Sequence, residues 1–479
     1  MTSANEPPGG ASSARSGPPD IEPSHPAAVL MVASAAALGG FLFGYDTAVI
    51  NGTVDAVREQ FGMTEGALGT VVSAALLGCA VGAWFAGRLA DRWGRIRVML
   101  LAAIVFAVTA IASALAWDPV SLLVFRLFGG LAIGAASVIA PAYIAEIAPA
   151  HLRGRLGSLQ QLAVVTGIFA SLLIDTLLAA SAGGANEQVP WGGTAWRWMF
   201  ASAALPAVVY GVLALQIPES PRYLVKKHKF EQAKDVLRRY VGGNVDFKIE
   251  EISRSLAGGD QVVNLRDLRG PRFGLLPIVW VGILLSVFQQ FVGINVIFYY
   301  SSSLWHSVGF TEKDSLLIST FTSVTNIVTT LVAISLVDKI GRKPLLIIGA
   351  SGMILTLGTM AFCFSQSVGS GADLTLPGAY GPVALVAANF YVFSFGMSWG
   401  PVVWVLLGEM FNNRIRATAL AVAAAAQWIA NWAVSVSFPS LAKVGLQFAY
   451  GLYTAFAALA LIFVWRAVRE TKGRELEDM

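Results

Sequence analysis

The composition of this chain of 479 residues excludes most classes of soluble protein. The chain is 56% hydrophobic and only 13% charged, with a mean hydropathy of +0.65, whereas an ordinary soluble domain is about 25% charged. So few charges could not cover the surface of a water-soluble protein of 50.6 kDa. The net charge is only +4 and the basic residues lie between apolar runs, so we expect no nucleic-acid partner. Cys79, Cys363 and four scattered histidines indicate no disulfide framework, no metal site and no cofactor.

Twelve apolar runs are each long enough to cross a hydrocarbon core, which takes about 20 helical residues. Every backbone group must be paired inside lipid, so these runs are expected to be helices rather than open strands. The first six runs are 27–50, 66–86, 96–116, 119–142, 157–180 and 196–216. The second six are 274–305, 314–337, 345–365, 380–408, 417–439 and 446–468. The sequence therefore predicts an all-α membrane protein.

Polar segments divide the chain into its expected parts. Residues 1–26 are rich in Pro, Ser, Gly and Ala, which predicts a disordered tail. The stretch 219–272 carries apolar residues at helical spacing, which predicts short amphipathic helices on the cytoplasmic side. We therefore expect a tail at 1–26, a six-helix bundle at 27–218, a helical linker at 219–272, a second six-helix bundle at 273–468 and a tail at 469–479.

Basic residues are distributed unequally between the two sides of the membrane. Loops on the side of the two termini hold 28 of the 33 lysines and arginines. The opposite loops hold Arg58, Arg197, Lys313 and Lys443, and the remaining basic residue, Arg126, lies inside a span. By the positive-inside rule, both termini are cytoplasmic. We expect a monomeric, multi-pass protein in the lipid bilayer of the plasma membrane.

Two sets of motifs recur in the two halves of the chain. The motif GRLADRWGR at 87–95 follows the second run, and SLVDKIGRK at 335–343 follows the eighth. Their matching residues Asp91 and Asp338 lie 247 residues apart, as do Gly94 and Gly341. Acid–base pairs seven residues apart follow the fourth and tenth runs: Glu146 with Arg153, and Glu409 with Arg416. The halves are therefore expected to be parallel repeats of six spans. Such pseudo-symmetry suits a midplane site that opens to each side in turn.

At this point the sequence resembles a known group. The twelve-span repeat and the paired loop motifs resemble the major facilitator superfamily. Four further motifs resemble its sugar porter family: PESPR at 218–222, ETKG at 470–473, QQFVGIN at 289–295 and RLFGG at 126–130. The resemblance covers about residues 27–475 and implies two pseudo-symmetric bundles that transport a sugar by alternating access.

Two charges lie inside the predicted spans of the first half. Asp46 and Arg126 would each cost roughly 2.5–3.5 kcal/mol at the centre of a span. At 1.5 Å per residue they lie roughly 6 and 10 Å below the same surface, so they could meet directly or through water. A carboxyl whose partner moves away during a conformational change acts as a proton switch, and an ionised Asp46 is expected to favour the outward-open state. A static pair that fixes helix packing is the alternative.

The resemblance favours proton coupling. The segment FGYD at 43–46 resembles the corresponding position of proton-coupled sugar symporters, whereas facilitative relatives carry a neutral residue there. Asp46 is therefore expected to be the proton acceptor and Arg126 its modulator. Asp175, the other acid inside a span, is expected to face a vestibule or a helix interface.

A sugar site needs amides for the hydroxyl groups and aromatic platforms for the apolar ring faces. Gly293 lies between Gln290 and Asn295, which predicts a break in the seventh span, where a binding site is expected. Trp399 precedes Gly400 and Pro401, which predicts a second break in the tenth span. For any single amide, an interhelical hydrogen bond is the alternative role.

The resemblance assigns sugar contacts to residues from six spans, counting the second choices. They are Gln161, Gln289, Gln290, Asn295, Asn326, Trp399, Gln427 and Trp428, with Asn431, Trp404, Phe43, Tyr299 and Tyr300 as second choices. Ile168 resembles the aliphatic residue of glucose-transporting relatives, which favours glucose. Charged residues at one mouth of the bundles are expected to pair across the halves and gate the site: Asp91, Arg92, Arg95, Glu146, Arg153, Asp338, Arg342, Glu409 and Arg416.

The function expected from these features is proton-coupled import of a monosaccharide, with glucose favoured. A facilitative sugar uniporter of the same fold is the first alternative. A non-transporting sugar receptor is the second, although such relatives usually have longer cytoplasmic tails. An enzyme is not expected, because the sequence contains no nucleophile–base pair, phosphate loop or metal-spaced cluster.

Overall fold

The computed structural model describes residues 26–148, 153–241, 244–257, 268–271, 273–369, 375–411 and 415–471. Within this part of the chain, 12 helical segments are long and apolar enough to cross a membrane. They confirm the all-α membrane fold predicted from the sequence. Of the tails expected at 1–26 and 469–479, residues 1–25 and 472–479 lie outside the described residues, as do Gly242, Gly243, Gly258 and Gly259 of the linker.

The helices of the first half form six spans, the last of which consists of two segments. They are α1 (Pro26–Phe61), α2 (Glu65–Trp93), α3 (Arg95–Ala114), α4 (Pro119–Ile147), α5 (Arg153–Ala182), α6 (Ala195–Ser202) and α7 (Ala204–Ala214). The linker follows with α8 (Pro221–Lys226), α9 (Phe230–Val236), a π-helical turn at Leu237–Val241 and α10 (Val245–Ala257).

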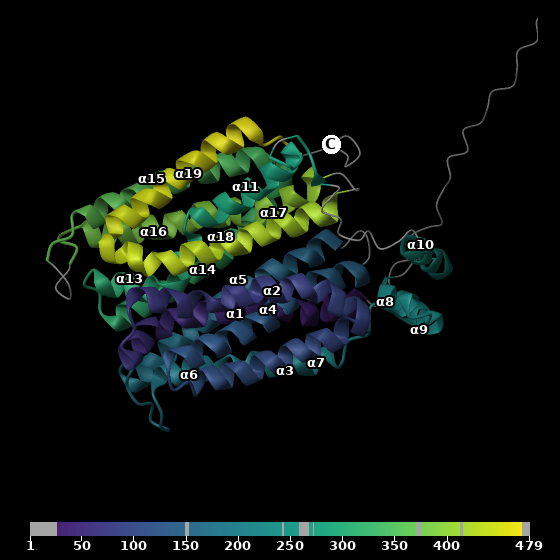
Figure 1. Ribbon diagram of the computed structural model, residues 1–479, viewed down its shortest axis with the longest axis horizontal. Coiled ribbons are helices and arrows are strands. Elements are labelled where there is room, and N and C mark those ends of the chain that lie inside the picture. The colour runs from purple at the N-terminus through teal and green to yellow at the C-terminus, as the bar shows by residue number, and fades with distance from the viewer. Residues whose placement is uncertain are drawn as a thin grey trace, which may run out of the picture.

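The second half contains more broken spans than the first. Its helices are α11 (Pro277–Phe291), α12 (Ile294–Tyr299), α13 (Ser301–Ser307), α14 (Glu312–Ile340), α15 (Arg342–Ser365), α16 (Tyr380–Gly396), α17 (Trp399–Met410), α18 (Arg416–Val444) and α19 (Leu446–Ala467). Figure 1 shows the two halves as neighbouring bundles, α1–α7 in purple to blue and α11–α19 in green to yellow.

The linker helices mark one end of the molecule. In Figure 1, α8, α9 and α10 lie beyond one end of the first bundle, which we call the linker end, and the opposite end is the far end. Lys234 of α9 lies 3.1 Å from Asp246 of α10, and this hydrogen bond with its charge attraction raises the pKa of Lys234. The two linker helices are thereby joined on the molecular surface.

The first span is longer than the sequence predicted. We expected it to end at residue 50, but α1 continues to Phe61. The additional turns are polar, and Arg58 lies 3.6 Å from Asp55 in an i,i+3 pair that suits a helix surface. Hydropathy does not reveal such an extension. Consequently, Asp46 lies near the middle of α1 rather than close to its end.

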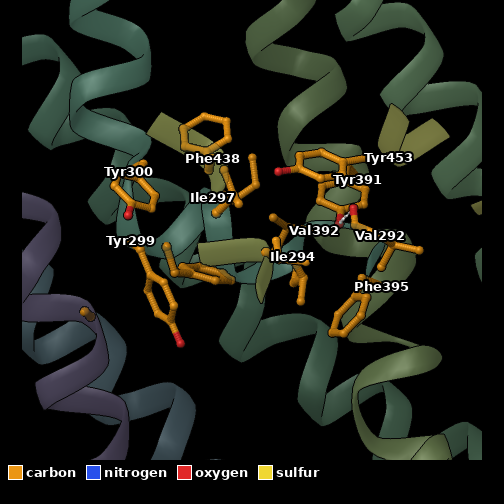
Figure 2. Close-up of a cluster of buried hydrophobic side chains, with 14 of the residues drawn as sticks. Val292, Ile294, Ile297, Tyr299, Tyr300, Tyr391, Val392, Phe395, Phe438 and Tyr453 are labelled. Carbon is orange, nitrogen blue, oxygen red and sulfur yellow. Dashed lines mark hydrogen bonds between the residues drawn. The ribbon is translucent and has the colours of Figure 1, made fainter. Parts of the chain in front are cut away.

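Both predicted breaks in the second half are present. Gly293 has a left-handed conformation, with φ of +83°, between α11 and α12. The Tyr391 hydroxyl donates to the Val292 carbonyl oxygen at 2.6 Å, and the Tyr453 ring covers Gly293 so closely that a Cβ there would lie 2.7 Å from it. Figure 2 shows these tyrosines gathered around the break. A second break separates α16 from α17 at Met397 and Ser398.

Glycines bring α2 and α4 into backbone contact. A Cβ on Gly82 would lie 2.1 Å from the Leu131 carbonyl oxygen, and one on Gly130 would lie 2.1 Å from that of Ala75. Small residues let membrane helices approach this closely, and the gain is van der Waals packing rather than hydrophobic burial. The helix that carries Arg126 is therefore packed firmly against α2.

Replacing Gly82 with Ala should lower the melting temperature of the purified protein, because overpacking a tight contact costs about 1–3 kcal/mol. Gly87→Ala, on the same helix, is the matched control, since an added Cβ there would meet nothing within 4 Å. Its melting temperature should stay the same or rise slightly, because Ala favours helix over Gly by about 1 kcal/mol. Thermal unfolding followed by tryptophan fluorescence compares the two. Equal melting temperatures would contradict the packing account.

Candidate functional site

The structure brings Asp46 and Arg126 together inside the first bundle. The Arg126 Nη1 atom lies 2.6 Å from Asp46 Oδ1, so α1 and α4 are joined by a charged hydrogen bond. Asp46 is 6% exposed and Arg126 is 4% exposed. Pairing is what makes both charges tolerable there, since a single buried charge is strongly unfavourable.

The surroundings of this pair leave the guanidinium partly unsatisfied. Arg126 Nε has no hydrogen-bond partner among the described residues. The Phe200 ring lies 5.8 Å from the guanidinium carbon, and a cavity of about 10 Å³ beside the pair is also lined by Thr109 and Ser113. Such a cavity has room for one water molecule at most. The pair is therefore nearly dry and held mainly by its own contact.

A chain of hydrogen-bonded amides crosses the first break of the second half. Asn295 Nδ2 donates to Gln290 Oε1 at 2.6 Å, and Gln290 Nε2 donates to Gln289 Oε1 at 3.3 Å. Gln289 Nε2 then donates to the carbonyl oxygens of Trp399 and Gly400, at 2.8 and 3.1 Å. The two broken spans are thus connected through side-chain amides. Each amide keeps further donor or acceptor capacity that a polar ligand could use.

A second polar contact lies between α12 and α18. Asn431 Nδ2 donates to the Tyr299 hydroxyl at 3.4 Å, and Ser435 donates to Asn431 Oδ1 at 3.3 Å. On the neighbouring turn of α18, the Trp428 ring meets Phe43 of α1 edge to face, with ring centroids 5.5 Å apart. This aromatic pair joins the two halves.

Other residues predicted for the sugar site do not join the amide chain. Among the described contacts, no hydrogen bond connects Gln161, Asn326 or Gln427 to it, and Gln427 Oε1 is buried without a partner. The Trp399 indole is fully buried and donates to the Leu346 carbonyl oxygen at 2.9 Å, so in this conformation its ring is not an open platform. Trp404 is 43% exposed on the bundle surface.

The charged residues at the linker end form a network within the first half. Arg95 lies 2.8 Å from Glu146 and 3.0 Å from Asp91. Ser220 of the PESPR segment donates to Glu146, and Glu219 accepts from the backbone N–H groups of Arg95 and Ile96. Glu219 thereby satisfies free donors at the start of α3.

The second half repeats this network with corresponding residues. Arg342 lies 2.7 Å from Glu409, and Thr471 donates to Glu409 at 2.6 Å. Glu470 accepts from the backbone N–H groups of Arg342 and Lys343 at 3.0 and 2.9 Å. In the sequence, PESPR and ETKG stand out only through the family resemblance, which does not predict that Glu219 and Glu470 accept hydrogen bonds at the starts of helices.

The described ion pairs of this set lie within one half each, rather than across the halves. The Arg92 side chain is exposed, and its backbone carbonyl accepts from the Tyr223 hydroxyl at 3.5 Å. The side chains of Arg153, Asp338 and Arg416 lie outside the described residues. In this conformation, the network stabilises each half separately at the linker end.

The hydrogen bonds between the halves that the structure describes all gather toward the far end. Asn51 Nδ2 of α1 donates to the Phe298 carbonyl oxygen at 3.0 Å, and Asn51 also accepts from the Ser302 backbone. Thr176 of α5 lies 2.9 Å from the Thr320 hydroxyl of α14. These short polar contacts were not predicted, because the sequence does not show which residue of the other half a polar side chain contacts. They close the far end.

Comparison with known proteins agrees with this architecture. The family model for sugar (and other) transporters matches residues 32–479. The glucose transport protein of Synechocystis sp. (strain PCC 6803) is 56% identical over 454 residues, covering 94% of this chain and 97% of that protein. The D-xylose-proton symporter of Escherichia coli K12 is 38% identical over 488 residues, covering 94% of this chain and 95% of that protein.

A solved structure has the same fold. The inward-open form of the xylose transporter XylE from E. coli matches with a TM-score of 0.80 at 37% identity, covering 94% of this chain and 98% of that one. The resemblance drawn from the sequence motifs is thereby confirmed. This multi-pass membrane protein has the major facilitator fold and belongs to the family of sugar (and other) transporters.

Proposed function

We propose that this protein is a proton-coupled glucose symporter that imports the sugar across the plasma membrane by alternating access. The main support for proton coupling is the buried ion pair of Asp46 and Arg126. Similarity to proteins named for glucose transport and for D-xylose–proton symport supports a sugar and a proton as the two substrates. The protein moves both substrates chemically unchanged and is not an enzyme.

The carboxylate of Asp46 can be neutralised in two alternative ways, by the guanidinium of Arg126 or by a proton. In the paired state the carboxylate is neutralised by Arg126 at 2.6 Å, and in the protonated state it no longer needs that partner. Proton uptake from outside would release Arg126, and proton release to the cytoplasm would restore the pair. For each proton carried, the cycle therefore breaks and re-forms the Asp46–Arg126 contact between α1 and α4.

The pair is present while the far end is closed, which modifies one expectation from the sequence. We expected an ionised Asp46 to favour the outward-open state. The Asp46–Arg126 contact, however, lies wholly within the first half and is compatible with closure of the far end. We assign this conformation to the stage at which the proton has left to the cytoplasm. Similarity to an inward-open structure supports that assignment.

The amide chain and the adjacent aromatic residues are the proposed sugar site. Gln289, Gln290 and Asn295 lie at the break between α11 and α12, and Asn431 and Trp428 lie on α18. Amides both donate and accept, which matches hydroxyl groups, and Trp428 offers an apolar face to the ring. Gln161, Asn326, Trp399 and Gln427 are proposed to join this site when the sugar is bound.

The linker end is the proposed cytoplasmic end, which also places both termini in the cytoplasm. The excess of lysine and arginine on this side supports that orientation. Here Arg95 with Glu146, and Arg342 with Glu409, are proposed to face each other and gate the site when this end closes. Asp91, Arg92, Arg153, Asp338 and Arg416 are proposed to take part in the same closure.

Replacing Asp46 with Asn should abolish uphill glucose uptake while glucose exchange down its gradient continues. The amide cannot carry a proton, whereas the sugar site stays intact. Proteoliposomes with and without an imposed pH gradient measure both activities. Asp118→Asn, an acid-to-amide change at the N-cap of α4 where Asn caps equally well, is the control and should keep uphill uptake.

Two other results would point to different functions. Full uphill uptake by the Asp46→Asn protein would rule out proton coupling through Asp46. Glucose flux without proton movement in the unmodified protein would instead identify a facilitative uniporter.

Replacing Asn295 with Ala should weaken glucose binding roughly 5- to 150-fold, because removing a hydrogen-bond partner in a buried site costs about 1–3 kcal/mol. Binding is measured by isothermal titration calorimetry on the detergent-solubilised protein. Asn389→Ala is the control, because this membrane amide is bonded to Thr325 and to the Leu385 carbonyl, outside the amide chain. Equal glucose affinity in the Asn295→Ala and unmodified proteins would remove Asn295 from the sugar site.

A further inference from the structure

The spans contain a second acid, which the proposed proton cycle does not use. Asp175 lies on α5 and its side chain is fully buried. Neither of its carboxyl oxygens accepts a hydrogen bond of good geometry from the described residues, although the backbone N–H of Gly52 lies close to the carboxyl. The carboxyl lies directly against α1, where a Cβ on Gly52 would come within 2.7 Å of Oδ2. Of the two locations expected for Asp175, the structure therefore places it at a helix interface.

The position of Asp175 coincides with the contact between the halves. The next residue on α5, Thr176, lies 2.9 Å from the Thr320 hydroxyl of α14. On α1, the residue before Gly52 is Asn51, which is bonded to Phe298 and Ser302 of the second half. The buried carboxyl thus lies between two sets of contacts that must break when the far end opens.

No described cation is bonded to Asp175. The helix α5 packs against α1, α4, α6 and α14. Tyr45 of α1 interacts with Asp175 through space, but its hydroxyl is bonded to Ser202. Other ionisable groups on these helices also have partners elsewhere: Asp46 pairs with Arg126, Asp55 with Arg58 and Ser303, Arg197 with the carbonyl oxygens of Ala114 and Ala116, and Glu312 with the Ala185 backbone. A carboxylate at this position would have no counter-charge.

Physical chemistry decides which form of the carboxyl occupies this position. An isolated carboxylate in an apolar interior is far less favourable than the neutral acid. The neutral acid also gains an O–H group, which can donate to a backbone carbonyl of the neighbouring helix. Asp175 therefore holds a proton while the far end is closed. Water that enters when α14, α12 and α13 move away would stabilise the ionised form instead.

We propose that Asp175 is a second proton-binding site, which takes up a proton from the outer side when the far end closes and returns it there when the far end opens. The step is a reversible protonation in which the outer water supplies and receives the proton. It rests on the alternating access of the proposed function. Because loading and unloading occur on the same side, this proton is not transported. Acid outside the cell would instead favour the far-closed state.

The test measures the far end directly and removes Asp46 from the titration. In an Asp46→Asn protein, spin labels are attached at Gln60→Cys and Lys313→Cys, which are exposed positions at the far ends of α1 and α14. Both native cysteines are buried and should remain unlabelled. Double electron–electron resonance measures the distances between the two spin labels from pH 5.5 to 8.5, and these distances report the ratio of far-closed to far-open molecules.

With Asp175 present, the far-open fraction should rise with pH, and the closed-to-open ratio should change by up to tenfold per pH unit, the limit for one linked proton. Adding Asp175→Asn should make the far-closed state dominant at every pH, while adding Asp118→Asn should leave the pH response unchanged. An unchanged pH response with Asp175→Asn would overturn the proposal.

Infrared spectroscopy provides an independent measurement that does not depend on the behaviour of the Asp175→Asn variant. The Asp46→Asn protein at neutral pH should show the C=O stretching band of a protonated, buried carboxyl group. The intensity of this band should fall as rising pH increases the far-open fraction. If the far-closed protein shows no such band, Asp175 is ionised there and the proposal is wrong. Neither measurement depends on sugar transport, so the outcome is separate from that of the transport experiment with Asp46→Asn.

Discussion

The contact between Asp46 and Arg126 is the interaction on which the proposed activity depends. A charge in the middle of a membrane is tolerated when it is paired, and here a single guanidinium–carboxylate contact neutralises both groups. The acid lies on α1, the same helix that carries Asn51 and Phe43 into contact with the second half. Protonation of one side chain and closure of one end are thus linked through a single helix.

The two halves differ in how they are built. The first half contains long continuous helices, with glycine contacts between α2 and α4 and between α1 and α5. The second half contains the breaks at Gly293 and before Trp399, and the amides lie beside them. A firm bundle that holds the charges therefore faces a bundle whose interrupted helices can present polar groups. This division suits a protein that must bind a proton and a neutral ligand at different places.

Much of the fold could be predicted because the bilayer imposes a simple rule. Long apolar runs must be helices, so twelve spans followed from hydropathy, and the break at Gly293 followed from one glycine between amides. The polar end of α1 could not be predicted, since its last turns lie beyond the apolar core. The proximity of Asp46 and Arg126 followed from counting residues, although Asp46 turned out to lie deeper in its helix.

Details of the candidate site depended on side-chain packing that a sequence does not show. Spacing placed Gln289, Gln290 and Asn295 near one another, but which amide donates to which acceptor depends on the rotation of α11 and α12. Trp399 was expected to offer its ring, whereas packing against α15 turns the indole toward the Leu346 carbonyl. The isolation of Asp175 also became visible only with its neighbours, because a lone acid in an apolar run looks the same with or without a partner.

The contacts at the two ends of the molecule differ in their chemistry. The far end is held mainly by amide, hydroxyl and backbone groups such as Asn51, Ser302, Thr176 and Thr320. The linker end is built from arginine–glutamate networks that are repeated in both halves. Dissolved ions weaken attraction between charged groups near water far more than they weaken short neutral hydrogen bonds. The two ends therefore respond to different properties of their surroundings, and salt acts on the linker end through the partly exposed members of its ion pairs.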